Sequence, residues 1–195
     1  MKRILSVLVI LCLLVSCSAC SAKKPKWEGF RGLQWGASKE EIIKAEGRDP
    51  DYYTPEFRVE SGETMVLVEY QNESVSKYKD CAYVNYNLLN DHLVFSRYIV
   101  PSDSLDSDYA YLKKALTDTY GEPSGQGLEL ISRLFDFVGG STAELVNPVL
   151  WAVDDTVVIL YVNSSNVHVF YYGKDYFEQN KFADGAPETV DNAGL

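Results

Sequence analysis

A helical segment followed by three strand-like segments occurs twice along the chain, and this order limits the possible folds more than any other feature. The first helix is predicted over 38–47 and the second within 101–123. Each ends at a glycine, Gly47 or Gly121, and glycine commonly ends a helix by taking the left-handed conformation. We therefore expect an α+β fold, in which two α-β-β-β repeats form an antiparallel sheet with helices packed on it.

The starts of both predicted helices carry capping residues. Ser38 is followed three residues later by Glu41, which is the capping-box pattern. In the second helix, Asp106 or Ser107 is expected to cap the first turn, and Pro123 follows the terminal glycine.

Alternating or continuous apolar residues, rich in β-branched and aromatic types, predict strands in six segments. Two turns, Asn90-Asp91 and the four residues 163–166, separate the last two strands of each unit. An offset of 74 residues aligns Gly47 with Gly121, and the same offset aligns several strand residues, so we expect repeats of about 27–100 and 101–177. The six segments are 63–71, 80–89, 92–100, 128–138, 149–162 and 167–173.

Neither alternation of these strands is clearly polar, so both faces of the sheet are expected to be covered. The cover could be the loop 139–150 together with the N-terminal segment, or it could be a partner or ligand. Mixed tyrosine, asparagine and arginine side chains on one alternation would suit a protein or glycan partner. The residues expected to bind are Tyr83, Asn85, Asn87, Arg97, Tyr161 and Tyr171.

The chain begins with Lys2, Arg3 and an almost wholly apolar run over 4–15. This run is too short for a bilayer-spanning helix, which needs roughly 20 apolar residues, and is typical of a signal peptide. The tetrapeptide Leu14-Val15-Ser16-Cys17 that follows resembles the lipobox of bacterial lipoproteins. The resemblance implies removal of residues 1–16 and attachment of diacylglycerol to the sulfur of Cys17.

Two other interpretations of this region are a secretory peptide cut elsewhere and a redox or zinc pair formed by Cys17 and Cys20. Residues 17–26 are expected to form a lipidated tether to the domain at 27–177, and 178–195 a flexible tail. A bridge between Cys20 and Cys81 stays open. We expect Cys81 to be a small buried residue of a strand.

The α-β-β-β doubling, with the segments "WGASKEEIIKAEG" and "LKKALTDTYGEP", resembles the β-lactamase-inhibitor-protein-like fold and the small lipoproteins of outer-membrane assembly. The resemblance implies a non-enzymatic, protein-binding domain. It transfers no functional residue.

The sequence shows no residue pattern typical of catalysis or metal binding, so neither activity is expected. His92 and His168 lack a zinc-ligand spacing, and His168 is expected to be a hydrogen-bonded sheet residue. The aspartates near 103–108 lack the glycine and spacing of a calcium loop. A net charge of −10 argues against nucleic-acid partners.

We therefore expect a lipoprotein of the bacterial cell envelope, without cofactor or metal, anchored by membrane lipid at Cys17. It would sit on the outer side of the cytoplasmic membrane or in the outer membrane, and bind an envelope protein through its sheet or helix surface. The alternative is a solute-binding lipoprotein that holds a glycan or an apolar ligand on an aromatic sheet face.

Overall fold

The computed structural model describes residues 29–58, 63–124 and 146–174. The predicted signal peptide, tether, strand 128–138 and tail lie outside these described residues. The secondary structure elements are β1 (Gly29–Phe30), β2 (Leu33–Gln34), α2 (Lys39–Glu46), β3 (Tyr52–Tyr53), β4 (Phe57–Arg58), β5 (Thr64–Val75), β6 (Tyr78–Leu89), β7 (His92–Pro101), α3 (Leu105–Tyr120), β8 (Val146–Val153), β9 (Thr156–Val162) and β10 (Asn166–Gly173).

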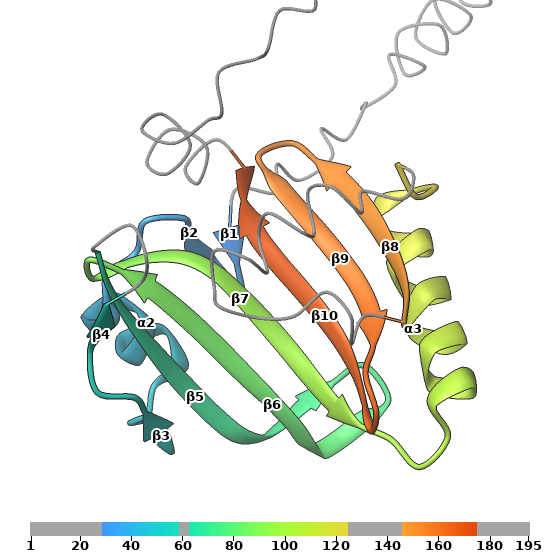
Figure 1. Ribbon diagram of the computed structural model, residues 1–195, viewed down its shortest axis with the longest axis horizontal. Helices are drawn as coiled ribbons and strands as arrows, with labels where there is room; N and C mark the ends of the chain where they lie inside the picture. The colour runs from blue at the N-terminus through green and yellow to red at the C-terminus, as the bar shows by residue number, and fades with distance from the viewer. Residues whose placement is uncertain (1–28, 59–62, 125–145, 175–195) are drawn as a thin grey trace, which may run out of the picture.

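The long strands form one antiparallel sheet in the order β3-β5-β6-β7-β10-β9-β8, and β4 also pairs with β5 (Figure 1). The three long strands that follow α2, β5 to β7, lie together, as do β8 to β10 after α3, and the two groups meet where β7 pairs with β10. A separate pair, β1 with β2, completes the strands. The predicted α+β class with an antiparallel sheet is confirmed.

Helix α2 forms as its capping residues predict. The Ser38 side chain accepts a hydrogen bond from the Glu41 backbone, the Glu41 side chain accepts one from the Ser38 backbone, and Gly47 ends the helix with φ 69°. Ile42 on its inner side is fully buried.

Helix α3 begins earlier than predicted, so the expectation of a cap at Asp106 or Ser107 is wrong. Its N-cap is Ser104, whose side chain makes no capping hydrogen bond. The carboxylate of Asp108 instead accepts hydrogen bonds from the Ser102 hydroxyl (2.6 Å) and the Tyr78 hydroxyl (2.7 Å). These bonds tie the first turn of α3 to the tip of the β5–β6 hairpin.

The segment 149–162, predicted as one strand, is two strands joined by a tight turn at Asp154-Asp155. Asp154 has φ 52°, a conformation that aspartate accepts more readily than most residues. Part of the predicted loop 139–150 therefore belongs to strand β8, and the rest lies outside the described residues.

One face of the sheet, here called the helix face, packs against both helices and the β1–β2 pair. Trp35 lies across this core, and its indole donates to the Thr156 hydroxyl (3.1 Å). The same indole covers Gly173, where an added Cβ would come within 2.3 Å of the ring. Fully buried strand residues of the helix face include Val68, Tyr70, Ala82, Val84, Tyr86, Leu93, Val100, Val158, Leu160 and Val167.

The opposite face, here called the distal face, carries Asn85, Arg97, Phe170 and Ile159 in one row across four strands. Within the described part of the chain, neither helix packs on it; Ile42, Leu112 and Leu116 all point into the helix-face core. Most distal side chains are nevertheless buried, Ile159 completely. The prediction that apolar side chains occupy both faces of the sheet is thus confirmed.

Alternation in the sequence puts Leu93 and the odd-numbered residues 167–171 on the same face as Asn85 and Arg97, and this assignment is wrong at both places. A bulge at Val94 lets Leu88 lie opposite Leu93 but Asn87 opposite Phe95, so Leu93 turns to the helix face. The four-residue turn after β9 sets Tyr161 opposite His168, and this moves the odd-numbered residues of β10 to the helix face.

Cys81 is exposed near the start of β6, so the prediction that it is buried is wrong. The first residues of strand β6 extend past the core, and residues 79–81 are all exposed to solvent. The thiol of Cys81 is free, and Cys20 lies outside the described residues.

Candidate functional site

Five of the six residues predicted to bind a partner or ligand share the distal face. Asn85, Asn87, Arg97 and Tyr161 lie on it by strand register, and Tyr83 follows the same alternation of β6. Tyr171 lies on the helix face, opposite Ser96, and its ring packs against Phe30 and Tyr98. It is therefore a core residue and does not belong to the site.

A chain of polar side chains crosses the distal face from β5 to β7. The Asn85 amide nitrogen donates to Glu69 Oε2 (3.0 Å), and its amide oxygen accepts from Arg97 Nε (3.3 Å) and Nη2 (3.2 Å). Asn85 is 1% exposed, whereas Glu69 and Arg97 are half-buried. The amide thus separates a carboxylate from a guanidinium and forms hydrogen bonds with both.

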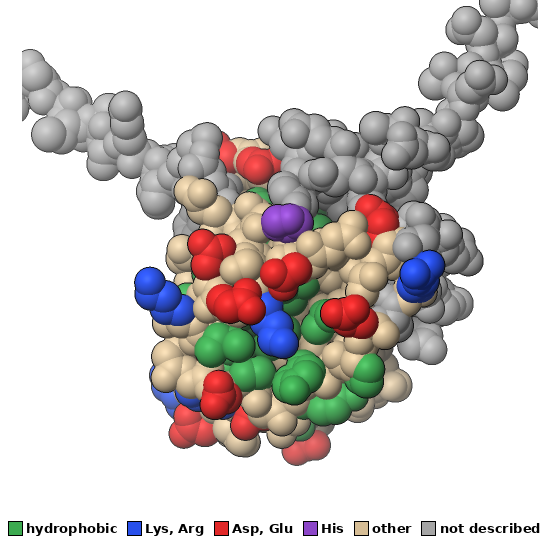
Figure 2. Space-filling model, turned by 90° about the vertical axis from the view of Figure 1, so that its left-hand side faces the viewer, with side chains coloured by type: hydrophobic (Ala, Val, Ile, Leu, Met, Phe, Trp, Pro, Cys, Tyr) green, Lys and Arg blue, Asp and Glu red, His purple; other side chains and the backbone are tan. Residues whose placement is uncertain are grey.

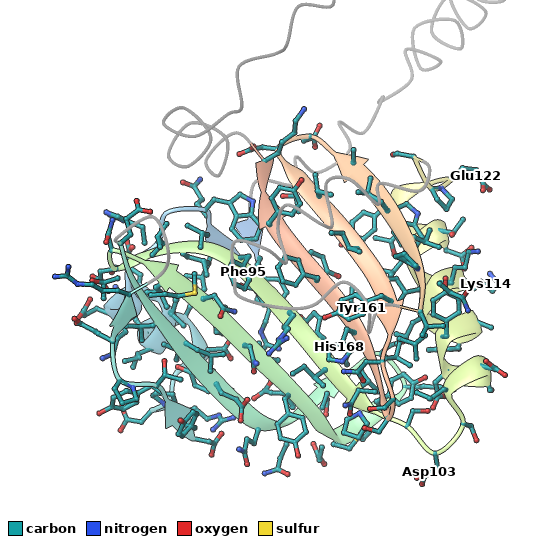
Figure 3. The ribbon with its side chains drawn as sticks, in the orientation of Figure 1. Phe95, Asp103, Lys114, Glu122, Tyr161 and His168 are labelled. Carbon is teal, nitrogen blue, oxygen red and sulfur yellow. The ribbon has the colours of Figure 1, made fainter. Side chains whose placement is uncertain are left out.

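Two rings from the other half of the sheet extend this chain. The Arg97 guanidinium donates to the Tyr161 hydroxyl, and burial raises the pKa of that hydroxyl. The imidazole of His168 stacks on the Tyr161 ring, with centroids 4.7 Å apart and an interplanar angle of 2°. Figure 3 shows Phe95, Tyr161 and His168 on the same face of the sheet. We call Glu69, Asn85, Arg97, Tyr161 and His168 the polar cluster.

The His168 ring is buried without a hydrogen bond. It is 4% exposed, and neither Nδ1 nor Nε2 has a partner. Burial, with a smaller effect from the nearby Arg97 charge, lowers the pKa of His168 to about 4. The prediction of a hydrogen-bonded sheet histidine is therefore wrong, because strand position satisfies only the backbone of the residue and not its ring.

Two further groups on this face have unmet requirements. The amide nitrogen of Asn87, a residue 5% exposed, has no hydrogen-bond partner. Among the described residues, no carboxylate forms an ion pair with Arg97; the cationic partners in the ion pairs are Arg31, Arg48, Lys77 and Lys114. Buried polar atoms in folded proteins are usually paired, so each of these exceptions needs an explanation.

A second feature lies at the sheet edge formed by β3 and β4. Tyr52 and Tyr53 are 51% and 57% exposed, and no described strand pairs with the outer side of β3. Lys39 at the start of α2 lies over the Tyr53 ring, with its nitrogen 4.8 Å from the centroid. Figure 2 shows this side of the molecule, where hydrophobic side chains gather among acidic ones. We call this surface the tyrosine edge.

A hollow of about 410 Å³ adjoins the tyrosine edge at Lys39. Three carboxylates and one ammonium group line it, together with amide, hydroxyl and apolar groups. The lining residues are Lys39, Glu40, Glu56, Thr64, Val66, Asn90 and Asp91.

Four residues of these surfaces were not predicted from the sequence as site residues: Glu69, His168, Tyr52 and Tyr53. Once the four-residue turn at 163–166 is taken as closing a hairpin, the alternation itself places His168 beside Tyr161. No comparable sequence signal marks Tyr52 and Tyr53, because their exposure depends on which strand forms the sheet edge.

The described residues contain no cluster of three or more His, Cys, Asp or Glu arranged to hold a metal ion. None of the helices in the described part of the chain is long and apolar enough to cross a membrane. Comparisons with protein-family models, with curated proteins and with solved structures find no match to this chain.

Proposed function

We propose that this chain is a lipid-anchored protein of the bacterial cell envelope, and that its α+β domain binds another envelope protein without catalysing a reaction. The signal-peptide pattern and the lipobox ending at Cys17 support the anchor. Two or more acyl chains, each methylene contributing about 0.8 kcal/mol, would hold the domain at the membrane surface.

The anchor is tested by the mass of the mature N-terminal peptide and by the partition of the chain between membrane and soluble fractions. Cys17→Ala should abolish the acyl mass and move the chain out of the membrane fraction. Cys20→Ala is the matched control and should leave both unchanged. A Cys17→Ala form that stays in the membrane fraction would contradict the anchor.

The observation that carries the binding proposal is the exposure of Tyr52 and Tyr53 on an unpaired sheet edge. A sheet edge offers backbone groups to an added strand, and exposed tyrosines are common anchors of protein interfaces. Among the described residues that line it, the adjoining hollow has the carboxylates of Glu40, Glu56 and Asp91 and one cation, so the expected partner is an extended segment that carries a lysine or arginine.

A photo-crosslinking amino acid at position 53, in intact cells, tests this docking site. We expect a discrete adduct that is lost when Tyr52 is changed to Ala and weakened when Glu56 is changed to Lys. A crosslinker at Lys113, exposed on α3, and the charge reversal Asp118→Lys are the matched controls. Equal crosslinking from positions 53 and 113 would overturn the assignment to the tyrosine edge.

The second candidate function is solute binding on the distal face. The unpartnered polar atoms of Asn87 and His168 support it, because a bound solute would satisfy them. The burial of Asn85, Asn87 and Tyr161 argues against an open aromatic platform, so the solute would have to fit between buried side chains.

We also propose that the two α-β-β-β units are structural repeats. The offset of 74 residues relates Ile42 to Leu116, the inward-facing residues of α2 and α3. It also relates the terminal helix bonds, from Gly47 N to Ile43 O and from Gly121 N to Thr117 O. Asp80 and Asp154, related by the same offset, both have positive φ.

A further inference from the structure

We propose that the polar cluster binds a carboxylate group, with Arg97 as its charge partner and the ring N–H of His168 as a second donor. The inference names the ligand class for the second candidate function and rests on it. It does not use the tyrosine edge: Tyr52 lies opposite Glu69 where β3 pairs with β5, whereas the two proposed donors, Arg97 and His168, lie on β7 and β10.

The positions of Arg97 and His168 allow one ligand to reach both. His168 on β10 lies opposite Ile99 on β7, two residues from Arg97 and on the same face. Such diagonal neighbours are about 7–8 Å apart and somewhat closer at Cβ, a gap that a carboxylate between an arginine and a histidine can span. The side chains also converge, because Tyr161 stacks on the His168 ring and accepts a hydrogen bond from Arg97.

The groups that could serve a ligand here are mainly donors. A neutral histidine offers one N–H and one acceptor nitrogen, and arginine carries five N–H bonds. Asn85 accepts from Nε and Nη2 of Arg97, which leaves N–H bonds of the guanidinium for a further acceptor. Because hydrogen bonds between arginine and a carboxylate are charge-assisted and strong, a carboxylate suits the Nη N–H bonds that Asn85 does not use.

The charges select a singly charged anion over other ligands. Arg97 repels cations, and an apolar ligand would leave the His168 nitrogens unsatisfied. Glu69 is separated from Arg97 only by the Asn85 amide, and its negative charge disfavours a doubly charged phosphate. The carboxylate could belong to a small organic acid or to the C-terminus of a peptide.

The test uses the full chain in non-ionic detergent micelles, with ¹⁵N-labelled imidazole rings, and adds sodium acetate at constant ionic strength. The chain has only two histidines, so His92, exposed at the β6–β7 turn, is an internal control. We expect saturable shifts of the His168 ring nitrogens and no such shift of His92. Shifts that never saturate, or that are equal in both rings, would overturn the proposal.

Variants assign the binding to the cluster. Arg97→Gln should weaken acetate binding by about tenfold or more, the usual effect of losing a charge-assisted hydrogen bond. Arg58→Gln on the exposed strand β4 is the control and should not change it. Should Arg97→Gln unfold, Arg97→Lys keeps the charge without the planar fork and should still weaken binding severalfold. Unchanged affinity in the folded Arg97 variant would refute the proposal.

Two further ligands separate the possible sources and functions. A tripeptide with a free C-terminus that binds more tightly than acetate, while its amidated form does not bind, would identify a peptide carboxylate as the ligand. A neutral disaccharide that shifts His168 when acetate does not would refute the carboxylate and leave solute binding intact. A His168 signal that responds to none of these ligands would overturn both.

Discussion

Replacing His168 by phenylalanine is expected to stabilise the fold, and the gain should grow as the pH falls. The imidazole is 4% exposed and unbonded, and it faces Arg97 on β7 and Tyr161 on β9. Phenylalanine keeps a ring of similar size to stack on Tyr161 and has no polar atoms to desolvate. Removing unsatisfied buried polar atoms should add about 1–3 kcal/mol at neutral pH.

The acid dependence follows from the lowered pKa of His168. In the unfolded chain the ring takes up a proton near pH 6.5, whereas in the folded chain it does so only near pH 4. Stability is therefore lost as the pH falls from 6.5 to 4, and His168 has no such effect above that range. At about 1.36 kcal/mol per pKa unit, the full loss is about 3 kcal/mol, and about 2.5 kcal/mol of it is reached at pH 4.5.

Urea unfolding followed by tryptophan fluorescence, at pH 7.5 and 4.5 in chloride buffers, measures this effect. The difference in unfolding free energy between His168→Phe and the parent chain should be larger at pH 4.5 by about 2.5 kcal/mol. His92→Phe, at an exposed turn, is the control and should show no such increase. If the parent chain and His168→Phe lose the same stability between the two pH values, the ring is not held neutral by burial and the reasoning is refuted.

Three other substitutions test the packing. Gly173→Ala places a Cβ 2.3 Å from the Trp35 ring, so it should destabilise by about 1–3 kcal/mol and change the tryptophan fluorescence. Ile42→Ala should cost about 2–5 kcal/mol in urea unfolding, because the residue is fully buried between α2 and the sheet; a cost below 1 kcal/mol would contradict that packing. The Ser102 and Tyr78 hydroxyls and Lys77 lower the pKa of Asp108, so its contribution should be lost as the pH falls below about 3.8. Asp108→Asn should remove that acid-sensitive contribution, and an unchanged acid-unfolding curve would contradict it.

Local sequence signals predicted the parts of the fold that depend on neighbouring residues. The Ser38 capping box and Gly47 marked α2 because each acts within one helical turn. The Asn90-Asp91 turn was predictable for a similar reason, since both residues accept the positive φ that the hairpin needs. The Asp154-Asp155 turn was missed because an apolar run continues on both sides of it.

The face on which a strand residue lies was less predictable, because it depends on pairing between strands. One extra residue at Val94 reverses the alternation along β7, and the length of the 163–166 turn sets it for β10. Arg97 was assigned to its face correctly, whereas Tyr171 was not. The 163–166 turn is enough to place His168 beside Tyr161, but the neighbours of His168 on β7 depend on pairing between the two halves of the sheet, which no local pattern in the sequence encodes.

The polar cluster lies where the two proposed repeats differ. At the 74-residue offset, Asn85 corresponds to Ile159 on the same face of the sheet, so the second unit has an apolar residue where the first has the amide that links Glu69 and Arg97. Arg97 corresponds to Tyr171, and the Val94 bulge places these two residues on opposite faces. Residues that build the core retain their character in both units, as Val84 and Val158 do. This group of polar residues departs from the repeat, and the unpaired ring nitrogens of His168 within it cost stability. That is the pattern expected of residues kept for binding.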